Sequence, residues 1–149
     1  MGIDDEITAR FDEDTLTWNL FGSDKFLGKF SHGRNPRVEL SGVGESFEIR
    51  TGLLGFTPTL TRNEEQLLKA RSSIFTGNWK IRIGDSDLVI RQKSFTVLHD
   101  TFRLFKDGQK ICTFRKQRRG LWSIRPTASI DAHLLAFVFW LVLHQPAGD

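Results

Sequence analysis

The chain has 149 residues, of which 26% are charged and 39% are hydrophobic, and its formal net charge is +3. This length and balance predict one globular domain with a substantial hydrophobic core. The single cysteine, Cys112, excludes an internal disulfide framework and predicts a reducing, cytoplasmic compartment.

The N-terminal segment is strongly acidic. Residues 1–14 hold six acidic side chains and one basic side chain, and they lack the apolar stretch of a secretory signal. We expect 1–14 to be a segment whose charge allows disorder, followed by a single domain over 15–149. The stretch "LTWNLFGSDKFLGKF", residues 16–30, is expected to supply the first strands of that domain.

From residue 45 onward the chain predicts short strands separated by turns that contain Gly, Asn and Asp. In the stretch "WKIRI", Trp79, Ile81 and Ile83 share one face, and Lys80 and Arg82 share the other. No convincing helical pattern interrupts these strands. They are expected over residues 46–50, 57–62, 66–75, 79–83, 88–95, 96–105, 110–117 and 121–127.

A loose internal repeat runs through this region. Strands that reach Arg50, Arg71, Arg91 and Arg115 are separated by 21, 20 and 24 residues. Each is followed by a turn and a partner strand, which predicts hairpins of an antiparallel sheet rather than a strict solenoid. An antiparallel sheet can remove its exposed edges by closing into a barrel.

The last predicted element is the apolar stretch "AHLLAFVFWLVLH", residues 132–144. As a helix it would be roughly 20 Å long, whereas a bilayer core needs about 30 Å. A helix that is apolar on every side is usually buried in protein. We therefore favour a buried helix over about 131–144, with Asp131 as its N-cap, over a tail anchor, a re-entrant membrane segment or a long buried strand.

These elements together predict an all-β fold with one buried helix. A closed antiparallel β-barrel around the hydrophobic C-terminal α-helix would hide every face of that helix. The inward aromatic side chains of the strands would then pack around Phe137, Phe139 and Trp140.

This order of elements resembles the Tubby C-terminal-like superfamily, which includes Tubby proteins, phospholipid scramblases and LURP-one-related proteins. The stretches "FEIRTGLLGFTPTLTRNEEQLLKAR" (47–71) and "FKDGQKICTFRKQ" (105–117) are most similar to the LURP-one-related branch. The resemblance covers about residues 45–144 and implies a closed barrel threaded by its C-terminal helix. It also implies contact with anionic lipids. The chain lacks the cysteine-rich segment of scramblases and the terminal motif of Tubby proteins, so neither lipid scrambling nor Tubby-type transcriptional action is implied.

Residues typical of catalysis are scattered along the chain. His32, His99, His133 and His144 lack the spacing of metal ligands, and we expect the last two to cap the helix or meet solvent. Cys112 lies between apolar residues and is expected in the core. No glycine-rich stretch precedes a helix that could hold a phosphate group. We expect no catalytic residue, no metal site and no cofactor, and hence no enzyme.

Charge is distributed unevenly along the chain. Residues 66–125 hold fourteen basic and four acidic side chains, a net charge of +10. Such a surface attracts anionic lipid headgroups or nucleic acid, although no RNA motif or recognition helix is present. We expect a peripheral binder of anionic phospholipids or phosphoinositides, without a transmembrane span. The alternatives are a merely solubilising surface, an intracellular protein-interaction or structural domain without lipid affinity, and an unrecognised enzyme with a pocket at the mouth of the barrel. The predicted lipid-binding residues are Arg91, Lys93, Arg115, Lys116, Arg118 and Arg119.

Overall fold

The structure is a computed structural model that describes residues 2–3, 5–23, 25–33, 35–51, 57–72, 78–92 and 101–144. The strands and the helix in these residues are β1 (Gly2–Ile3), β2 (Ile7–Asp12), β3 (Thr17–Gly22), β4 (Lys25–Ser31), β5 (Arg37–Leu40), β6 (Ser46–Arg50), β7 (Thr59–Arg62), β8 (Glu65–Ser72), β9 (Trp79–Ile83), β10 (Ser86–Gln92), β11 (Thr101–Lys106), β12 (Gln109–Arg118), β13 (Leu121–Pro126), β14 (Ile130–Asp131) and α1 (Ala132–Leu143).

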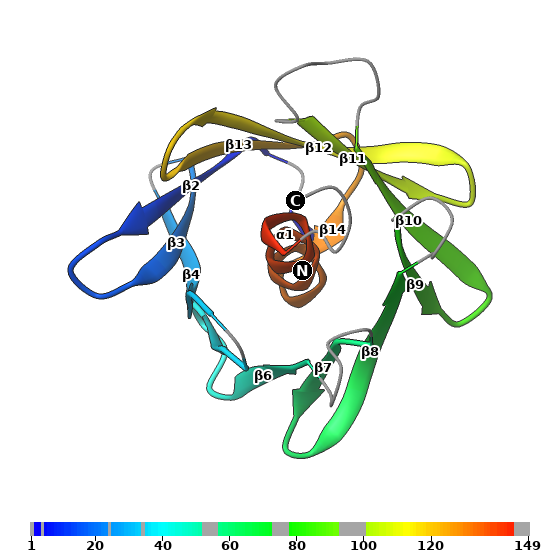
Figure 1. The fold of residues 1–149 in the computed structure, drawn as a ribbon, viewed down its shortest axis with the longest axis horizontal. Coiled ribbons are helices and arrows are strands. Elements are labelled where there is room, and N and C mark those ends of the chain that lie inside the picture. Colours follow the sequence, from blue (N-terminus) through cyan, green and yellow to red (C-terminus); the bar gives the residue numbers. More distant parts are fainter. Residues whose placement is uncertain are drawn as a thin grey trace.

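Strands β2 to β13 form a closed barrel of twelve strands within the described part of the chain (Figure 1). Within the barrel, strands that follow one another in the sequence pair antiparallel, while β1 and β14 pair with each other in a separate two-stranded sheet. The ring closes where β13 pairs with β2. The prediction of a closed antiparallel barrel is confirmed, and closure leaves the main-chain groups of the sheet no free edge.

Strand β2 corrects the expectation for residues 1–14. Ile7 and Ala9 are fully buried, and Ile7 lies opposite Ile124 of β13 in the register that closes the barrel. Thr8 and Arg10 point to the other face, so this short stretch alternates as a strand should. The acidic residues hide that pattern because they gather before the strand and from its last residue, Asp12, onward. The domain therefore includes residues that we had placed outside it.

Helix α1 fills the lumen, and Figure 1 shows it at the centre of the ring. A barrel of eight strands can be filled by side chains alone, whereas twelve strands enclose a wider space. Residues Leu134 to Val142 are all buried, as a helix surrounded by sheet requires. The buried-helix prediction is confirmed. Among the described residues, none of the helices has the length and apolar character needed to cross a membrane.

The predicted cap is incomplete at the N-terminal end of α1. Asp131 occupies the N-cap position with extended backbone angles, but its side chain makes no capping hydrogen bond. At the other end, the His144 ring stacks on Trp140 at 4.2 Å, and its Nδ1 donates to the Trp140 carbonyl oxygen over 2.9 Å. His144 therefore caps the helix as expected. His133 instead stacks on Phe47 at 5.8 Å. Packing against the barrel, rather than a strong N-cap, stabilises the helix.

The turns alternate between two ends of the barrel. The Trp140 indole Nε1 donates to the Gly33 carbonyl oxygen over 3.3 Å, which places the end of α1 at the β4–β5 turn. We call this the exit end, and it also carries the β2–β3 and β12–β13 turns. The opposite end, where α1 begins, is the entry end. His133 lies there, against Phe47 at the start of β6.

The predicted strands agree with the structure in most of the described chain. The strands at 46–50 and 79–83 have the predicted bounds, while β5 (Arg37–Leu40) was not predicted. Trp79 and Ile81 face the core, but Ile83 is 38% exposed because it lies at the end of β9. The predicted strand segments over 73–75 and 93–100 lie outside the described residues.

Candidate functional site

Basic side chains follow one another around the outer wall of strands β8 to β12. These strands carry several bases, and one base from each strand lies next to a base of the neighbouring strand, between inward-facing core positions or at the end of such a run. Four are exposed and Arg103 is half-buried. We call this set the basic ridge; its members are Arg71, Lys80, Arg91, Arg103 and Arg115.

Two pairs of ridge residues lie directly opposite each other on neighbouring strands. Arg71 of β8 is paired in register with Lys80 of β9, and Arg91 of β10 is paired with Arg103 of β11. Opposite residues on one face of an antiparallel pair have Cβ atoms about 4.5–5.5 Å apart. Like charges at that separation destabilise the sheet, so the two pairs require an explanation.

The two pairs and Arg115 form one continuous row. Lys80 lies opposite Val89, two residues before Arg91, and the same offset relates Arg103 to Arg115. Diagonal neighbours of this kind are roughly 7–8 Å apart, within reach of long side chains. The ridge therefore crosses five adjacent strands without interruption.

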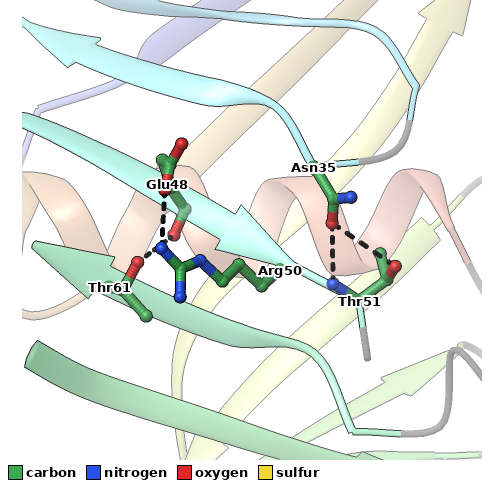
Figure 2. A network of polar contacts seen from close by, with 5 residues as sticks. All are labelled: Asn35, Glu48, Arg50, Thr51 and Thr61. Carbon is green, nitrogen blue, oxygen red and sulfur yellow. Dashed lines mark hydrogen bonds and ion pairs between the residues drawn. The ribbon is translucent and has the colours of Figure 1, made fainter. Parts of the chain in front are cut away.

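On the opposite wall of the barrel, several basic side chains form ion pairs with nearby acidic side chains. Figure 2 shows the Arg50 side chain reaching Glu48, with Nη2 and Oε2 3.1 Å apart. The Thr61 hydroxyl donates to the Glu48 carbonyl oxygen over 3.4 Å. The Thr51 amide donates to Asn35 Oδ1 over 3.0 Å. The five residues drawn in Figure 2 therefore each have a local polar partner.

Further ion pairs involve two other bases of that wall. Lys29 Nζ lies 3.6 Å from Glu39 Oε2, and Arg62 Nε lies 3.2 Å from Glu45 Oε2. Exposed pairs of this kind contribute little stability, but they cancel charge locally. Within the described ranges, no ridge residue has an ion pair with an acidic side chain. The ridge is thus a continuous row of bases without ion pairs, whereas Arg82, which lies beside it on β9, is paired with Asp87 at 3.8 Å.

One ridge residue rests on an aromatic ring. The Arg91 guanidinium carbon lies 5.2 Å from the ring centroid of Phe105, within the range of a cation–π interaction. Phe105 is half-buried and lies directly opposite Val89. The basic ridge therefore borders a small apolar contact on the same wall, formed by Phe105 and Val89.

The structure brings together only some of the predicted lipid-binding residues. Arg91 and Arg115 belong to the ridge, and Lys93 lies outside the described residues. Lys116, Arg118 and Arg119 lie at the exit end, where an irregularity in the β12–β13 pairing falls between Lys116 and Arg118. They form a second group at a turn, beside the ridge rather than within it.

An acidic turn lies next to this second group. The Phe11 amide donates to the Gly120 carbonyl oxygen over 2.9 Å, which joins the β2–β3 hairpin to the β12–β13 turn. The exposed residues that follow Phe11 are Asp12, Glu13 and Asp14. Their negative charge lowers the positive potential around Arg118 and Arg119. The cluster that is most conspicuous in the sequence is therefore the less favourable place for an anion.

The groups considered for catalysis lie elsewhere. Cys112 is fully buried, and burial raises the pKa of its thiol to about 12, which agrees with a core residue. Burial is also the main cause that lowers the pKa of His133, with a smaller contribution from Arg62. Among the described residues, no group of three His, Cys, Asp or Glu side chains could hold a metal ion. His99 lies outside those residues.

The sequence alone does not single out Lys80 or Arg103, and it marks Arg71 only as a member of the loose repeat. Strand alternation indicates that these side chains face outward. Their proximity depends on which strands pair and in which register, and no local pattern carries that information.

Comparison with known proteins adds no family. No protein-family model, no curated protein and no solved structure matches the chain. The structure establishes a closed barrel of twelve strands in the described residues, with a C-terminal helix. The resemblance to the Tubby C-terminal-like superfamily stays a prediction.

Proposed function

We propose that the protein is a non-enzymatic binding module that attaches peripherally to anionic phospholipids, phosphoinositides included, through the basic ridge. The observation that carries this proposal is the pairing of Arg71 with Lys80 and of Arg91 with Arg103. Both pairs face outward and have no acidic partner in the described chain. Such pairs destabilise the free protein, and a bound anion would relieve their repulsion.

The energetics favour a surface with many negative charges. Each directly opposed like-charge pair costs roughly 0.2–1 kcal/mol in the free protein. Each base close to an anionic membrane contributes about 1 kcal/mol to binding, so five ridge bases contribute roughly 5 kcal/mol. That corresponds to a few thousand-fold in partitioning, on the order of what peripheral attachment needs. Because these bases are solvent-exposed, salt weakens the attraction.

Nucleic acid is a poorer fit than a lipid surface. The helix of the described chain is enclosed by the barrel, so it cannot enter a groove. The half-buried Phe105 already carries the Arg91 guanidinium over its ring, so it is not a free platform for a base.

The wider proposal includes the family and the location. We place the chain as a distant relative of the LURP-one-related branch of the Tubby C-terminal-like superfamily, and the support is the barrel with a helix in its lumen. A cytoplasmic location at a membrane surface agrees with the buried single thiol of Cys112.

A protein-interaction domain is the second candidate function, and one observation favours it. Phe21 and Phe26 are 37% and 40% exposed, and their rings meet edge to face at 5.7 Å on β3 and β4. Exposed aromatic side chains that cluster on a wall can serve as a contact for a partner. This pair lies on a different part of the barrel from the ridge, so the two functions can be tested separately.

Vesicle co-sedimentation tests the proposal. Arg91→Gln combined with Arg103→Gln removes two ridge charges, about 2 kcal/mol of attraction, and should weaken binding to phosphatidylserine vesicles roughly 30-fold. The matched control, Lys29→Gln with Arg50→Gln, removes the same net charge from ion-paired positions and should change binding far less. Phe21→Ser should not affect it.

The melting temperature separates binding from folding in the same experiment. The ridge variant should melt at the wild-type temperature or slightly above it, because it loses a repulsive pair. Equal binding to phosphatidylcholine and phosphatidylserine vesicles, or binding to neither, contradicts lipid attachment and leaves protein interaction as the better candidate.

A further inference from the structure

Arg91 and Arg103 repel each other across β10 and β11, and both have long, flexible side chains. In the absence of another contact, the two guanidinium groups would turn apart. Arg91 does have such a contact: its guanidinium carbon lies 5.2 Å from the centroid of the Phe105 ring. Phe105 follows Arg103 by two residues on the same strand, so this ring lies diagonally across from Arg91 on the outer wall.

Phe105 is held in the regular part of the sheet, because the β10–β11 register runs without a shift from Leu88 to Gln92. On the β12 side Leu104 pairs with Cys112 and Phe105 with Lys110, so the extra residue of the irregularity is Ile111 of β12. Phe105 therefore keeps the outward direction that strand alternation gives it, on the same face as Arg103. On the other side Phe105 lies opposite the half-buried Val89, which supports the ring from β10.

We propose that Phe105 is a positioning residue of the basic ridge, which holds the Arg91 guanidinium beside Arg103 so that the two form a prearranged clamp for one phosphate group. This inference rests on the proposed function and names the part of the ridge that makes the closest contact. A planar guanidinium is weakly hydrated and stacks well on an aromatic face. Two of them together can supply the several charge-assisted hydrogen bonds that one phosphate group accepts.

The clamp gains affinity because its geometry exists before the ligand arrives. A flexible arginine must be ordered when it binds, and each ordered side chain reduces affinity by a factor of roughly 2 to 12. Stacking on Phe105 restricts Arg91 in advance. Loss of the ring should therefore weaken binding although every charge of the ridge remains.

The test compares Phe105→Leu with Phe105→Tyr, which keeps a ring, and with the control Phe26→Leu. Phe26 is also an exposed ring of the outer wall, and no basic side chain in the described residues lies over it. Phosphatidic acid vesicles test a lipid headgroup, and titration with inorganic phosphate tests the free ion. Phe105→Leu should weaken whichever of these binds by roughly 2- to 12-fold. Phe105→Tyr and Phe26→Leu should stay within about twofold of wild type.

A double-mutant cycle and the salt dependence show how Phe105 acts. In an Arg91→Gln background, Phe105→Leu should have no further effect, because the side chain that it positions is gone. Phe105→Leu should also leave the salt dependence of binding unchanged, whereas Arg91→Gln should reduce it. Wild-type affinity in Phe105→Leu, or the same loss with and without Arg91, overturns the inference.

A measurement on the free protein separates this inference from the proposed function. If wild-type protein binds neither vesicles nor phosphate, the proposed function fails. The positioning role is still tested by 15N relaxation of the Arg91 Nε group. Its order should fall in Phe105→Leu and remain in Phe26→Leu and Phe105→Tyr. Unchanged order in Phe105→Leu overturns the inference whatever the binding result.

Discussion

Phe139 lies at the centre of the filled lumen, and its replacement by alanine tests how the barrel and the helix stabilise each other. The side chain is fully buried. Its ring lies 5.3 Å from Trp18, 5.9 Å from Phe30, 5.7 Å from Trp122 and 6.3 Å from Phe114, measured between centroids. One helical residue therefore joins four strands of the wall.

The expected cost follows from these contacts. Truncation of a buried Phe to Ala destabilises a protein by about 3–5 kcal/mol, and the larger values occur where the surroundings cannot collapse. The four rings around Phe139 belong to strands fixed in a closed barrel, so we expect a loss near 5 kcal/mol. For a domain of this length each kcal/mol lowers the melting temperature by about 2–4 °C, which gives a decrease of roughly 10–20 °C. Phe139→Asp should prevent folding, because it buries an unpaired charge.

Urea denaturation followed by tryptophan fluorescence measures this change, since Trp18 and Trp122 contact the substituted ring. Phe26→Ala is the control, because Phe26 is 40% exposed on the outer wall and should lose less than about 1 kcal/mol. A loss below about 1 kcal/mol for Phe139→Ala, or a cooperative wild-type-like transition for Phe139→Asp, would refute a helix packed inside a closed barrel.

The remaining predictions concern three other sites. Cys112→Ala should cost roughly 1 kcal/mol and leave binding intact, and the native thiol should react slowly with a thiol reagent at neutral pH, because burial raises its pKa to about 12. Rapid labelling would place Cys112 at the surface. The pKa of His133 is lower in the folded protein than in the unfolded chain, so the unfolded state binds its proton first as pH falls. The free energy of unfolding should therefore decrease below about pH 6.5, and His133→Asn should flatten that part of the stability curve measured by urea denaturation. Arg118→Gln with Arg119→Gln, which removes the same charge as the ridge double variant, should weaken vesicle binding less than that variant does, with little change in melting temperature. A larger effect would move the binding site to the β12–β13 turn.

The apolar helix shows how far the sequence alone determines this protein. Ten apolar residues in a row, Leu134 to Leu143, leave the helix no side suited to water. They are too few to span a bilayer comfortably, so a protein shell must enclose them. Short alternating strands such as Trp79–Ile83 can form that shell. A sheet covers every side of the helix only if it closes into a barrel. Fold class and helix position follow from hydrophobicity and length, which are local properties.

Strand β2 and the basic ridge were decided by the tertiary structure. Ile7 and Ala9 form too short an apolar pattern to predict a strand among acidic residues, and pairing with β13 supplies what local sequence does not. Arg103 and Lys80 are ordinary outward-facing bases in the sequence. They become part of a site because closure of the barrel sets the register that brings them beside Arg91 and Arg71. Alternation determines which side of a sheet a residue faces, but its neighbours on that side depend on hydrogen-bonded pairing between distant segments.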